Sequence, residues 1–220
     1  MTLTLYEHPF ATYCWKPLIA LYEREVPFER RQVDDEADRA RLAELWPMAS
    51  IPTLVDDETG ATLPESTIVV EYLDGFTDAP PLIPADPAAA LQARFWDRII
   101  DLRVQTPVQK IVLDNLRPED AGDTYGVSEA RDALDRIYAV LDERLDGSAY
   151  LAGPTFTIAD AAAAPALFYA RALRRWDEDR LSRLTGYYET LTARPSVSRV
   201  IEEARPFRPL FPLPWPDYVD

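Results

Sequence analysis

The first 75 residues alternate short runs typical of strands with amphipathic stretches typical of helices. Compact apolar or alternating runs predict strands at residues 3–6, 28–33, 53–55 and 61–63. Apolar residues at helical spacing predict helices at residues 14–23 and 36–45 and a third that begins at Ser66. The predicted element order is βαβαββα, which indicates a mixed sheet with helices on its faces.

A proline-rich segment separates this region from the rest of the chain. Residues 78–87 hold four prolines in ten positions, which excludes a continuous helix or strand. After this segment the apolar spacing is purely helical, at about 88–116, 128–146, 157–173 and 178–204. We therefore predict a first domain at 1–77, a linker at 78–87, an all-helical domain at 88–204 and a proline-rich tail at 205–220.

One helix start carries a recognisable cap. The segment Thr157-Ile158-Ala159-Asp160 has the spacing of a capping box, with Asp in place of the usual Glu. An alanine-rich run follows it directly. The tail contrasts with this helix, because its prolines exclude a helix interior and its aromatic residues predict a strap packed onto the protein body.

Two motifs in the first domain predict a seat for a small extended peptide. Ile51-Pro52 opens a short apolar run, and a proline at the entrance of a strand leaves the preceding backbone free to pair with another chain. Glu65-Ser66 precedes an apolar helix, so it is typical of a helix N-terminus, where backbone amides and the dipole bind a carboxylate. Together they indicate a peptide ligand with a free carboxylate.

Composition narrows the class of protein further. A hydrophobic content of 47% over 220 residues supports a real core and argues against disorder. The net charge of -15 argues against nucleic acid and against an anionic membrane surface as partners. One cysteine and one histidine exclude an internal disulfide and argue against a metal site. With no signal-peptide pattern and no long apolar run, we expect a cytoplasmic protein.

The motifs, taken in order, resemble the cytosolic glutathione S-transferase superfamily of bacterial type. The resemblance extends over essentially the whole chain and rests on five segments: Leu5-Tyr6 leading into Pro9, Ile51-Pro52, Glu65-Ser66, residues 82–87 and residues 156–160. It implies an α/β plus all-α architecture, with a thioredoxin-like βαβαββα domain before an all-helical domain. It also implies glutathione as co-substrate without a metal, a small hydrophobic electrophile as second substrate, and a homodimer formed through the helix at 88–116.

The resemblance assigns roles within the predicted seat. Pro52 would follow a cis peptide bond, and the Ile51 backbone would pair with the cysteinyl unit of glutathione as an added strand does. Ser66 would bind the γ-glutamyl carboxylate through its hydroxyl and backbone N–H, and Glu65 would face the γ-glutamyl ammonium. Ser50 occupies a place near the glycyl carboxylate where relatives often carry a basic or polar side chain.

An anionic tripeptide also requires a local cation in a chain of net charge -15. Lys16 and Arg41 are the candidates for this cation. Activation of the glutathione thiol needs one hydrogen-bond donor in addition. Lowering the pKa of a thiol by about 2 units requires about 2.7 kcal/mol, and one hydrogen bond to a charged acceptor contributes about 1.5–3 kcal/mol. A single hydroxyl at a helix N-terminus is therefore sufficient.

The sequence leaves open which residue supplies this hydrogen bond. The position held by Ser or Cys in theta- and omega-like members falls on Ala11, which has no donor. Proline belongs in the first turn of a helix, so Pro17 predicts a helix start near residues 14–16 and places Cys14 at its N-terminus. Cys14 and Thr12 are the leading candidates. The alternatives are the backbone amides of this turn, Tyr13 and Tyr6.

The second-substrate pocket is expected between the domains. Its predicted lining includes Phe10 and Tyr13, with Gln105 and Gln109 as polar contacts, and the tail aromatics Phe211 and Trp215 are further candidates. We predict a glutathione transferase of detoxification type that attacks an apolar electrophile. A glutathione-dependent lyase, etherase or dehalogenase, a thiol reductase acting through Cys14, and a non-catalytic glutathione-binding protein remain alternatives.

Overall fold

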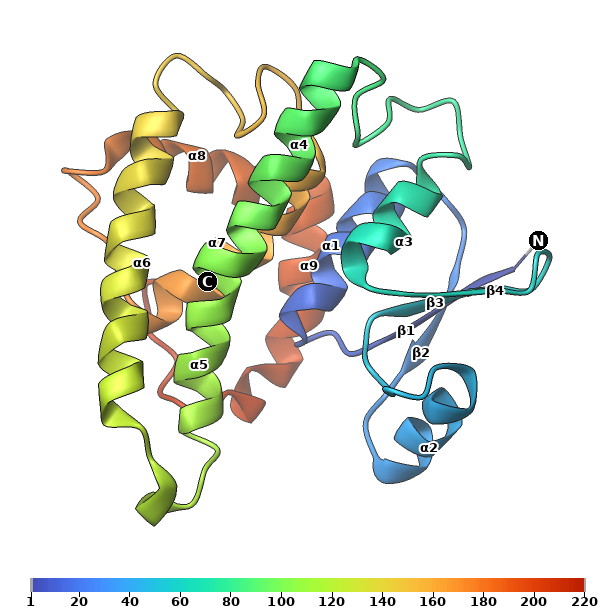
Figure 1. The fold of residues 1–220 in the computed structure, drawn as a ribbon, viewed down its shortest axis with the longest axis horizontal. Helices are drawn as coiled ribbons and strands as arrows, with labels where there is room; N and C mark the ends of the chain where they lie inside the picture. The colour runs from blue at the N-terminus through green and yellow to red at the C-terminus, as the bar shows by residue number, and fades with distance from the viewer. Residues whose placement is uncertain (1, 220) are drawn as a thin grey trace.

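The computed structural model describes residues 2–219, apart from the side chain of Glu119. Its N-terminal part is a four-stranded sheet with strand order β2-β1-β3-β4 (Figure 1). The strands are β1 (Leu3–Glu7), β2 (Glu29–Gln32), β3 (Thr53–Asp56) and β4 (Ala61–Pro64). β1 pairs parallel with β2 and antiparallel with β3, which pairs antiparallel with β4. The mixed sheet predicted from the sequence is confirmed.

Three helices complete this part: α1 (Thr12–Glu23), α2 (Glu36–Leu45) and α3 (Ser66–Leu73). α1 and α3 cover one face of the sheet, and α2 lies on the other side (Figure 1). Leu5 of β1 and Leu54 of β3 are fully buried in the core that α1 and α3 share. α2 buries only Leu42, and it starts at Asp35, whose carboxylate accepts a hydrogen bond from the Asp38 amide.

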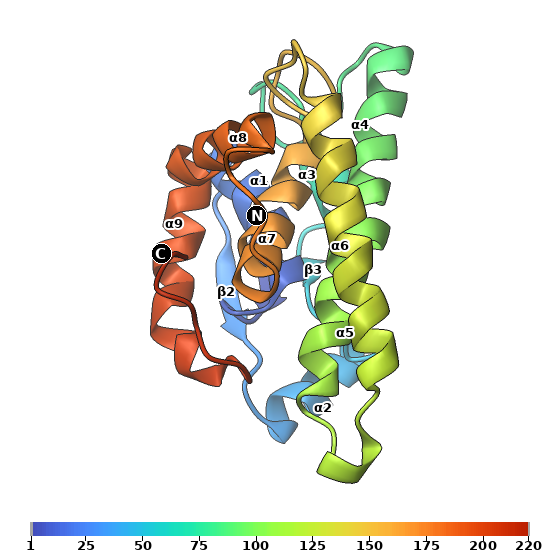
Figure 2. The same ribbon diagram turned by 90° about the vertical axis from the view of Figure 1, so that its left-hand side faces the viewer.

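The C-terminal part is entirely helical. Its α-helices are α4 (Pro87–Ile100), α5 (Thr106–Asp114), α6 (Thr124–Arg144), α7 (Ile158–Leu173), α8 (Ser182–Ala193) and α9 (Pro195–Ala204). A π-helical segment, η1 (Asp101–Gln105), joins α4 to α5, and two 3₁₀ segments are η2 (Glu119–Ala121) and η3 (Arg205–Leu210). The α4–α5 rod and α6 run side by side, with α7 at the centre of the helical part (Figures 1 and 2).

Two long predicted helices are therefore divided. The predicted helix at 88–116 contains the π segment, and the predicted helix at 178–204 is broken at Arg194, which is extended. Pro195 takes the first position of the new helix α9, where its missing N–H would have had no partner in any case. Apolar spacing continues across both interruptions, which is why the pattern alone does not reveal them.

α7 is the central helix because nearly every one of its residues is buried. Its alanines allow α1 and α4 to pack closely against it. The predicted capping box at its start is confirmed, with Thr157 and Asp160 satisfying each other's backbone N–H groups. The Asp160 carboxylate also accepts hydrogen bonds from the Leu151 amide at 3.0 Å and the Tyr187 hydroxyl at 2.6 Å. One buried carboxylate thus joins α7, α8 and the loop before them.

The tail is packed on the protein body, as expected from its aromatic residues. Phe211 and Val219 are buried. The Trp215 ring lies 6.1 Å from Phe10, which precedes α1, and 5.6 Å from Phe168 of α7. The tail therefore covers the junction between the two parts of the chain.

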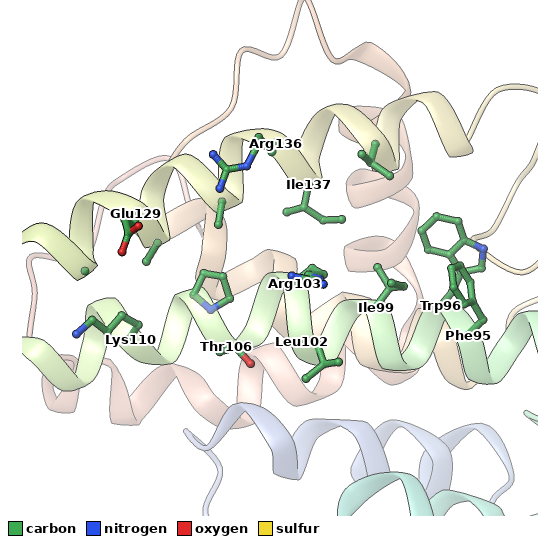
Figure 3. A pocket seen from close by; sticks show the side chains of 15 residues that line it. Phe95, Trp96, Ile99, Leu102, Arg103, Thr106, Lys110, Glu129, Arg136 and Ile137 are labelled. Atoms are coloured by element: carbon green, nitrogen blue, oxygen red, sulfur yellow. The ribbon is translucent and has the colours of Figure 1, made fainter.

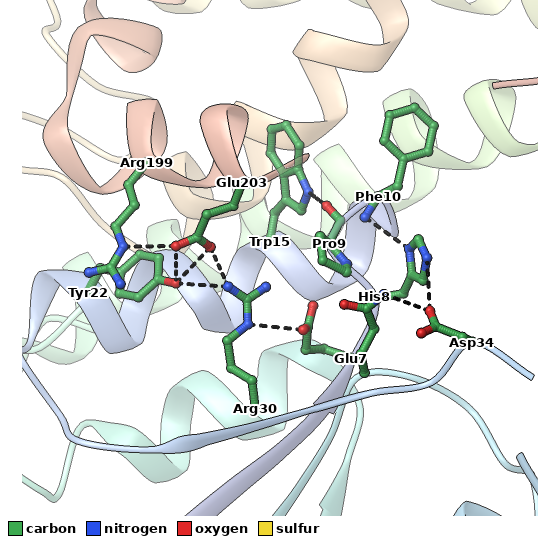
Figure 4. Close-up of polar contacts among 11 residues, drawn as sticks. Glu7, His8, Pro9, Phe10, Trp15, Tyr22, Arg30, Asp34, Arg199 and Glu203 are labelled. Atoms are coloured by element: carbon green, nitrogen blue, oxygen red, sulfur yellow. Dashed lines mark hydrogen bonds and ion pairs between the residues drawn. The ribbon is translucent and has the colours of Figure 1, made fainter. Parts of the chain in front are cut away.

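A charged network holds the last helix against the sheet (Figure 4). Arg30 of β2 contacts Glu7 of β1 at 3.0 Å and Glu203 of α9 at 2.5 Å. Tyr22 of α1 donates to the same Glu203 carboxylate at 2.9 Å. Burial raises the pKa of Glu7, so Arg30 is required to keep this carboxylate ionised.

Replacing Asp160 with alanine should lower the free energy of unfolding by about 3 kcal/mol, because several buried donors lose their acceptor at once. Urea unfolding followed by circular dichroism measures the change. Asp135→Ala is the matched control, since that carboxylate pairs with Arg174 at the surface and should contribute less than about 1 kcal/mol. Equal effects of the two substitutions would contradict this account of α7.

Candidate functional site

A cavity of about 670 Å³ opens between the N-terminal part and α4. It is called the peptide cavity here. Its lining combines the loop before β3, the start of α3, and one face of α4. The five residues predicted to form the peptide seat all line it: Ser50, Ile51, Pro52, Glu65 and Ser66. Segments separated in the sequence by about fifteen residues thus meet in one place.

The loop before β3 has a fixed shape. The Ile51-Pro52 peptide bond is cis, as the resemblance implied. The Ser50 carbonyl accepts a hydrogen bond from the Thr53 hydroxyl at 2.8 Å, and the Ser50 hydroxyl accepts one from the Trp46 indole at 3.1 Å. These contacts hold the Ile51 backbone at the edge of the cavity, where an extended peptide can pair with it.

The start of α3 forms a second wall with open backbone donors. Glu65 has φ of 72°, a left-handed conformation that is strained for a residue other than glycine. Its side chain does not cap the helix, so the first-turn amides of α3 have no side-chain acceptor. Ser66 is the first helical residue and is buried at the cavity wall. This arrangement is suited to a carboxylate, through the amides and the helix dipole.

The third wall, on α4, was not predicted as part of the site. Arg94, Asp97, Arg98 and Asp101 all line the cavity. Arg94 pairs with Glu71 of α3 at 3.0 Å, whereas Arg98 has no ion pair within the described residues. The four residues follow the i, i+3, i+4, i+7 spacing of one helical face, and this charged stripe on an otherwise apolar helix was the available signal.

Lys16 does not line the peptide cavity, and its ammonium is already paired with protein groups. Its ammonium is 2.8 Å from Asp97 and 3.3 Å from Asp101, and it donates to the Thr67 hydroxyl at 3.1 Å. The side chain is almost completely buried. Burial raises the pKa of Asp101, and the Lys16 charge opposes that shift.

The second cation suggested by the sequence is also elsewhere. Arg41 is exposed and pairs with Asp38 on α2. Arg39, on the same helix, instead lines a cavity beside Ile51 and has no ion pair in the part of the chain that the structure describes.

That second cavity has a volume of about 520 Å³ and is called the apolar cavity here. It shares Tyr13, Ile51 and Gln109 with the peptide cavity, so the two adjoin. The four residues predicted for the second-substrate pocket all line it: Phe10, Tyr13, Gln105 and Gln109. Phe211 of the tail also lines it, while Trp215 packs behind Phe211 at 5.1 Å.

Tyr13 lies where the two cavities meet, and Thr12 precedes it at the start of α1. Thr12 is the first residue of α1, follows Ala11, which offers no capping side chain, and lines the apolar cavity. Tyr13 lines both cavities, and burial, Asp101 and Glu65 raise its pKa to about 12. Its hydroxyl is therefore a neutral donor at physiological pH. The expected helix start near residues 14–16 is wrong, because α1 begins at Thr12 and contains Pro17 in its interior.

The structure does not bring Cys14 into either cavity. Its side chain is fully buried, and it faces the core beneath α1. Burial raises the pKa of the Cys14 thiol well above its ordinary value. A helix start two residues earlier than expected turns this side chain inward. Tyr6, another candidate, lies on β1 and lines neither cavity.

Residues 2–219 show neither a metal-ligand cluster nor a membrane-spanning helix. No group of three or more His, Cys, Asp or Glu side chains could hold a metal ion there. None of the helices in that range combines the length and the apolar character required to span a membrane.

Comparison with known families agrees with this architecture. The family model described as glutathione S-transferase, N-terminal domain, matches residues 5–81. The model described as glutathione S-transferase, C-terminal domain, matches residues 119–190. The chain belongs to the glutathione S-transferase superfamily.

Individual relatives carry different names. Glutathione S-transferase GstB of Escherichia coli (strain K12) is 27% identical, over 90% of this chain and 97% of its own. A stringent starvation protein A homolog of Coxiella burnetii is 28% identical, over 76% of this chain and 75% of its own. The crystal structure of a glutathione S-transferase from Methylobacillus flagellatus with GSH bound has a TM-score of 0.81 and 25% identity, covering 90% of this chain and 98% of that chain.

Cys14 should resist thiol reagents in the native protein. At pH 8 about a quarter of an ordinary exposed cysteine is thiolate, but burial and the raised pKa keep Cys14 protonated and covered. We expect labelling by a disulfide reagent to be at least about 100-fold slower than in urea at both pH 7 and pH 9, because the reagent reaches the thiol only after local opening. Mass spectrometry after incubation with oxidised glutathione should find no adduct. Rapid stoichiometric labelling would show that the Cys14 thiol is accessible and would make Cys14 a candidate active-site residue again.

Proposed function

We propose that this protein is a glutathione transferase, which stabilises the glutathione thiolate for attack on an apolar electrophile. The observation that carries the proposal is the contact between two unlike cavities. The peptide cavity is lined by backbone donors and charged side chains, and the adjoining apolar cavity is lined mainly by aromatic and aliphatic ones. A thiol held at the shared wall would face an electrophile held in the second cavity.

Glutathione fits the peptide cavity group by group. Its γ-glutamyl carboxylate would lie at the start of α3, on Ser66 and the first-turn amides, with its ammonium towards Glu65. Its cysteinyl unit would pair with the Ile51 backbone. Its glycyl carboxylate would then point towards α2, where Arg39 is the cation without an ion pair in the described chain. Arg39 thus replaces Lys16 and Arg41 as the proposed partner.

Thr12 is the proposed donor to the thiolate. Its position at the uncapped N-terminus of α1 combines a hydroxyl with backbone amides and the helix dipole. One hydrogen bond to a charged acceptor contributes about 1.5–3 kcal/mol, which corresponds to a thiol pKa lowered by about 1–2 units. Tyr13 is the alternative donor at the same wall.

Conjugation with 1-chloro-2,4-dinitrobenzene tests this assignment. The glutathione sulfur forms a bond to the ring carbon and chloride leaves. Thr12→Ala should lower kcat/KM by about 10- to 100-fold and raise the pKa seen in its pH profile by about one unit or more. The loss is therefore larger at pH 6.5 than at pH 9, because the weaker site holds less thiolate at the lower pH. Thr12→Ser should retain most of the activity.

Cys14→Ala is the matched control, since Cys14 lies only two residues from Thr12 on the same helix but its side chain is fully buried. It should leave the pH profile unchanged. If Tyr13→Phe lowers kcat/KM and Thr12→Ala does not, Tyr13 is the residue that donates to the thiolate. Calorimetry without heat from reduced glutathione at millimolar concentration would reject the proposal as a whole.

A second candidate function is glutathione binding without turnover. The 28% identity to the stringent starvation protein A homolog of Coxiella burnetii favours it, as does Ala11 at the position of the usual Ser or Cys. Tight glutathione binding with no conjugation of several electrophile classes would support this candidate. A thiol reductase acting through Cys14 is disfavoured, because the sulfur is buried.

We also propose a homodimer formed through the groove between the α4–α5 rod and α6. Figure 3 shows this groove, which has a volume of about 630 Å³. Phe95 and Val140 are about half exposed at it, and the charged residues Arg103, Glu129 and Arg136 also line it. An exposed apolar surface with both charge signs on a chain of net charge -15 is suited to a second copy of the same acidic chain.

Phe95→Glu and Val140→Glu should each convert a dimer into a monomer, because they place a charge in the apolar groove. Sedimentation velocity at several protein concentrations measures the change. Leu45→Glu is the control, since it adds the same charge at an exposed apolar residue of α2, away from the groove. A wild-type monomer at all concentrations would reject the dimer.

A further inference from the structure

Gln105 is a buried amide that the protein leaves without a partner. It is the last residue of the π segment η1 and only 3% exposed. Within the described residues its amide oxygen Oε1 has no hydrogen-bond partner. Gln105 lines the apolar cavity and also a void of about 10 Å³ behind it. A buried polar group in this state loses its hydration without compensation, so it requires a partner from elsewhere.

The protein around Gln105 leaves Oε1 without that partner. On the α7 side the void is lined by Ala162, Pro165 and Ala166, whose side chains have no donor. Thr12 and Tyr13 also line the void, but neither hydroxyl donates to Gln105 Oε1 within the described residues. The nearest ammonium, on Lys16, is directed to Asp97, Asp101 and Thr67. Because Gln105 also lines the apolar cavity, a ligand held there can supply the partner.

Another polar group at this cavity is already engaged. The Tyr169 hydroxyl donates to the Phe10 carbonyl at 3.1 Å, so it is not available as a donor to a ligand. The Phe10 ring lies 5.4 Å from Tyr169 and 6.2 Å from Phe211, both edge to face. The cavity thus offers an aromatic wall, favourable for a ring, and one unpaired amide deeper inside.

We propose that Gln105 selects second substrates that carry a hydroxyl group, so that the apolar cavity takes a hydroxylated aromatic electrophile. A hydroxyl both donates and accepts, so it pairs with the amide in either orientation of the Gln105 side chain. A substrate without it leaves the amide unpaired, and such sites discriminate strongly against the analogue that lacks the polar group. This inference rests on the proposed function, since it assigns the second substrate of the same site.

Matched enones test the selection during turnover. The probes are 4-phenylbut-3-en-2-one and its ortho-, meta- and para-hydroxyphenyl analogues. The glutathione sulfur adds to the β-carbon, and a proton from water completes the α-carbon. For at least one isomer, the ratio of kcat/KM for the hydroxylated probe to that for the parent should fall by about 10-fold or more in Gln105→Met relative to wild type. Comparing ratios removes the intrinsic reactivity of each enone.

Gln109→Met is the matched control. Gln109 lines the same cavity but is exposed, so water replaces its lost hydrogen bonds. It should change both rates by a similar factor and leave the ratio within about 2-fold of wild type. An equal fall in the ratio for Gln109→Met would assign the selection to the cavity mouth and overturn the role of Gln105.

A binding experiment tests this inference independently of the proposed function. The affinities of the apo protein for 4-phenylphenol and for biphenyl, followed by tryptophan fluorescence, require neither glutathione nor turnover. Wild type should favour the phenol by about 5-fold or more over the preference of Gln105→Met. Equal preferences in the two proteins would overturn the inference, even in an active transferase. A Gln105-dependent preference without any conjugation would support the inference and reject the proposed activity.

Discussion

The ammonium of Lys16, buried between two carboxylates of another helix, is the contact on which the site geometry depends. Lys16 belongs to α1, whereas Asp97 and Asp101 belong to the α4–η1 rod, so one ion cluster fixes the two parts of the chain against each other. Removing charges from water is costly, and such a cluster persists only where each charge has a partner. Both cavities have walls from both parts, and their shapes follow from this fixed separation.

Features set by local chemistry could be predicted from the sequence. The strand order along the chain, the cap at Thr157 and Asp160, and the helix start at Ser66 depend on a few neighbouring residues. The seat residues could also be grouped, because their motifs are local and follow each other closely. The cis bond before Pro52 was implied by resemblance rather than by the residues themselves.

Features set by tertiary packing could not be predicted in the same way. Pro17 suggested a later start of α1, but packing of this helix against α3 and α7 overrides the local preference of proline. Cys14 is consequently a core residue rather than a surface thiol. The π segment could not be predicted from the apolar spacing either. Its additional residue per turn changes which side chains face inward, but the average apolar spacing remains that of a helix. Gln105 was chosen as a polar contact, but its lack of a partner emerges only from the packing.

The two cavities are formed by regions that differ in how freely their sequences can change without disturbing the core. The peptide cavity uses the sheet edge, α3 and α4, which also carry the core, whereas part of the apolar cavity comes from Leu210, Phe211 and Pro212 near the chain end. Sequence drift, trimming or extension at the carboxyl terminus can therefore remodel one chamber while its neighbour keeps its form. Substitutions in residues 205–219 can change which molecules fit the apolar cavity while the residues that form the peptide cavity stay the same.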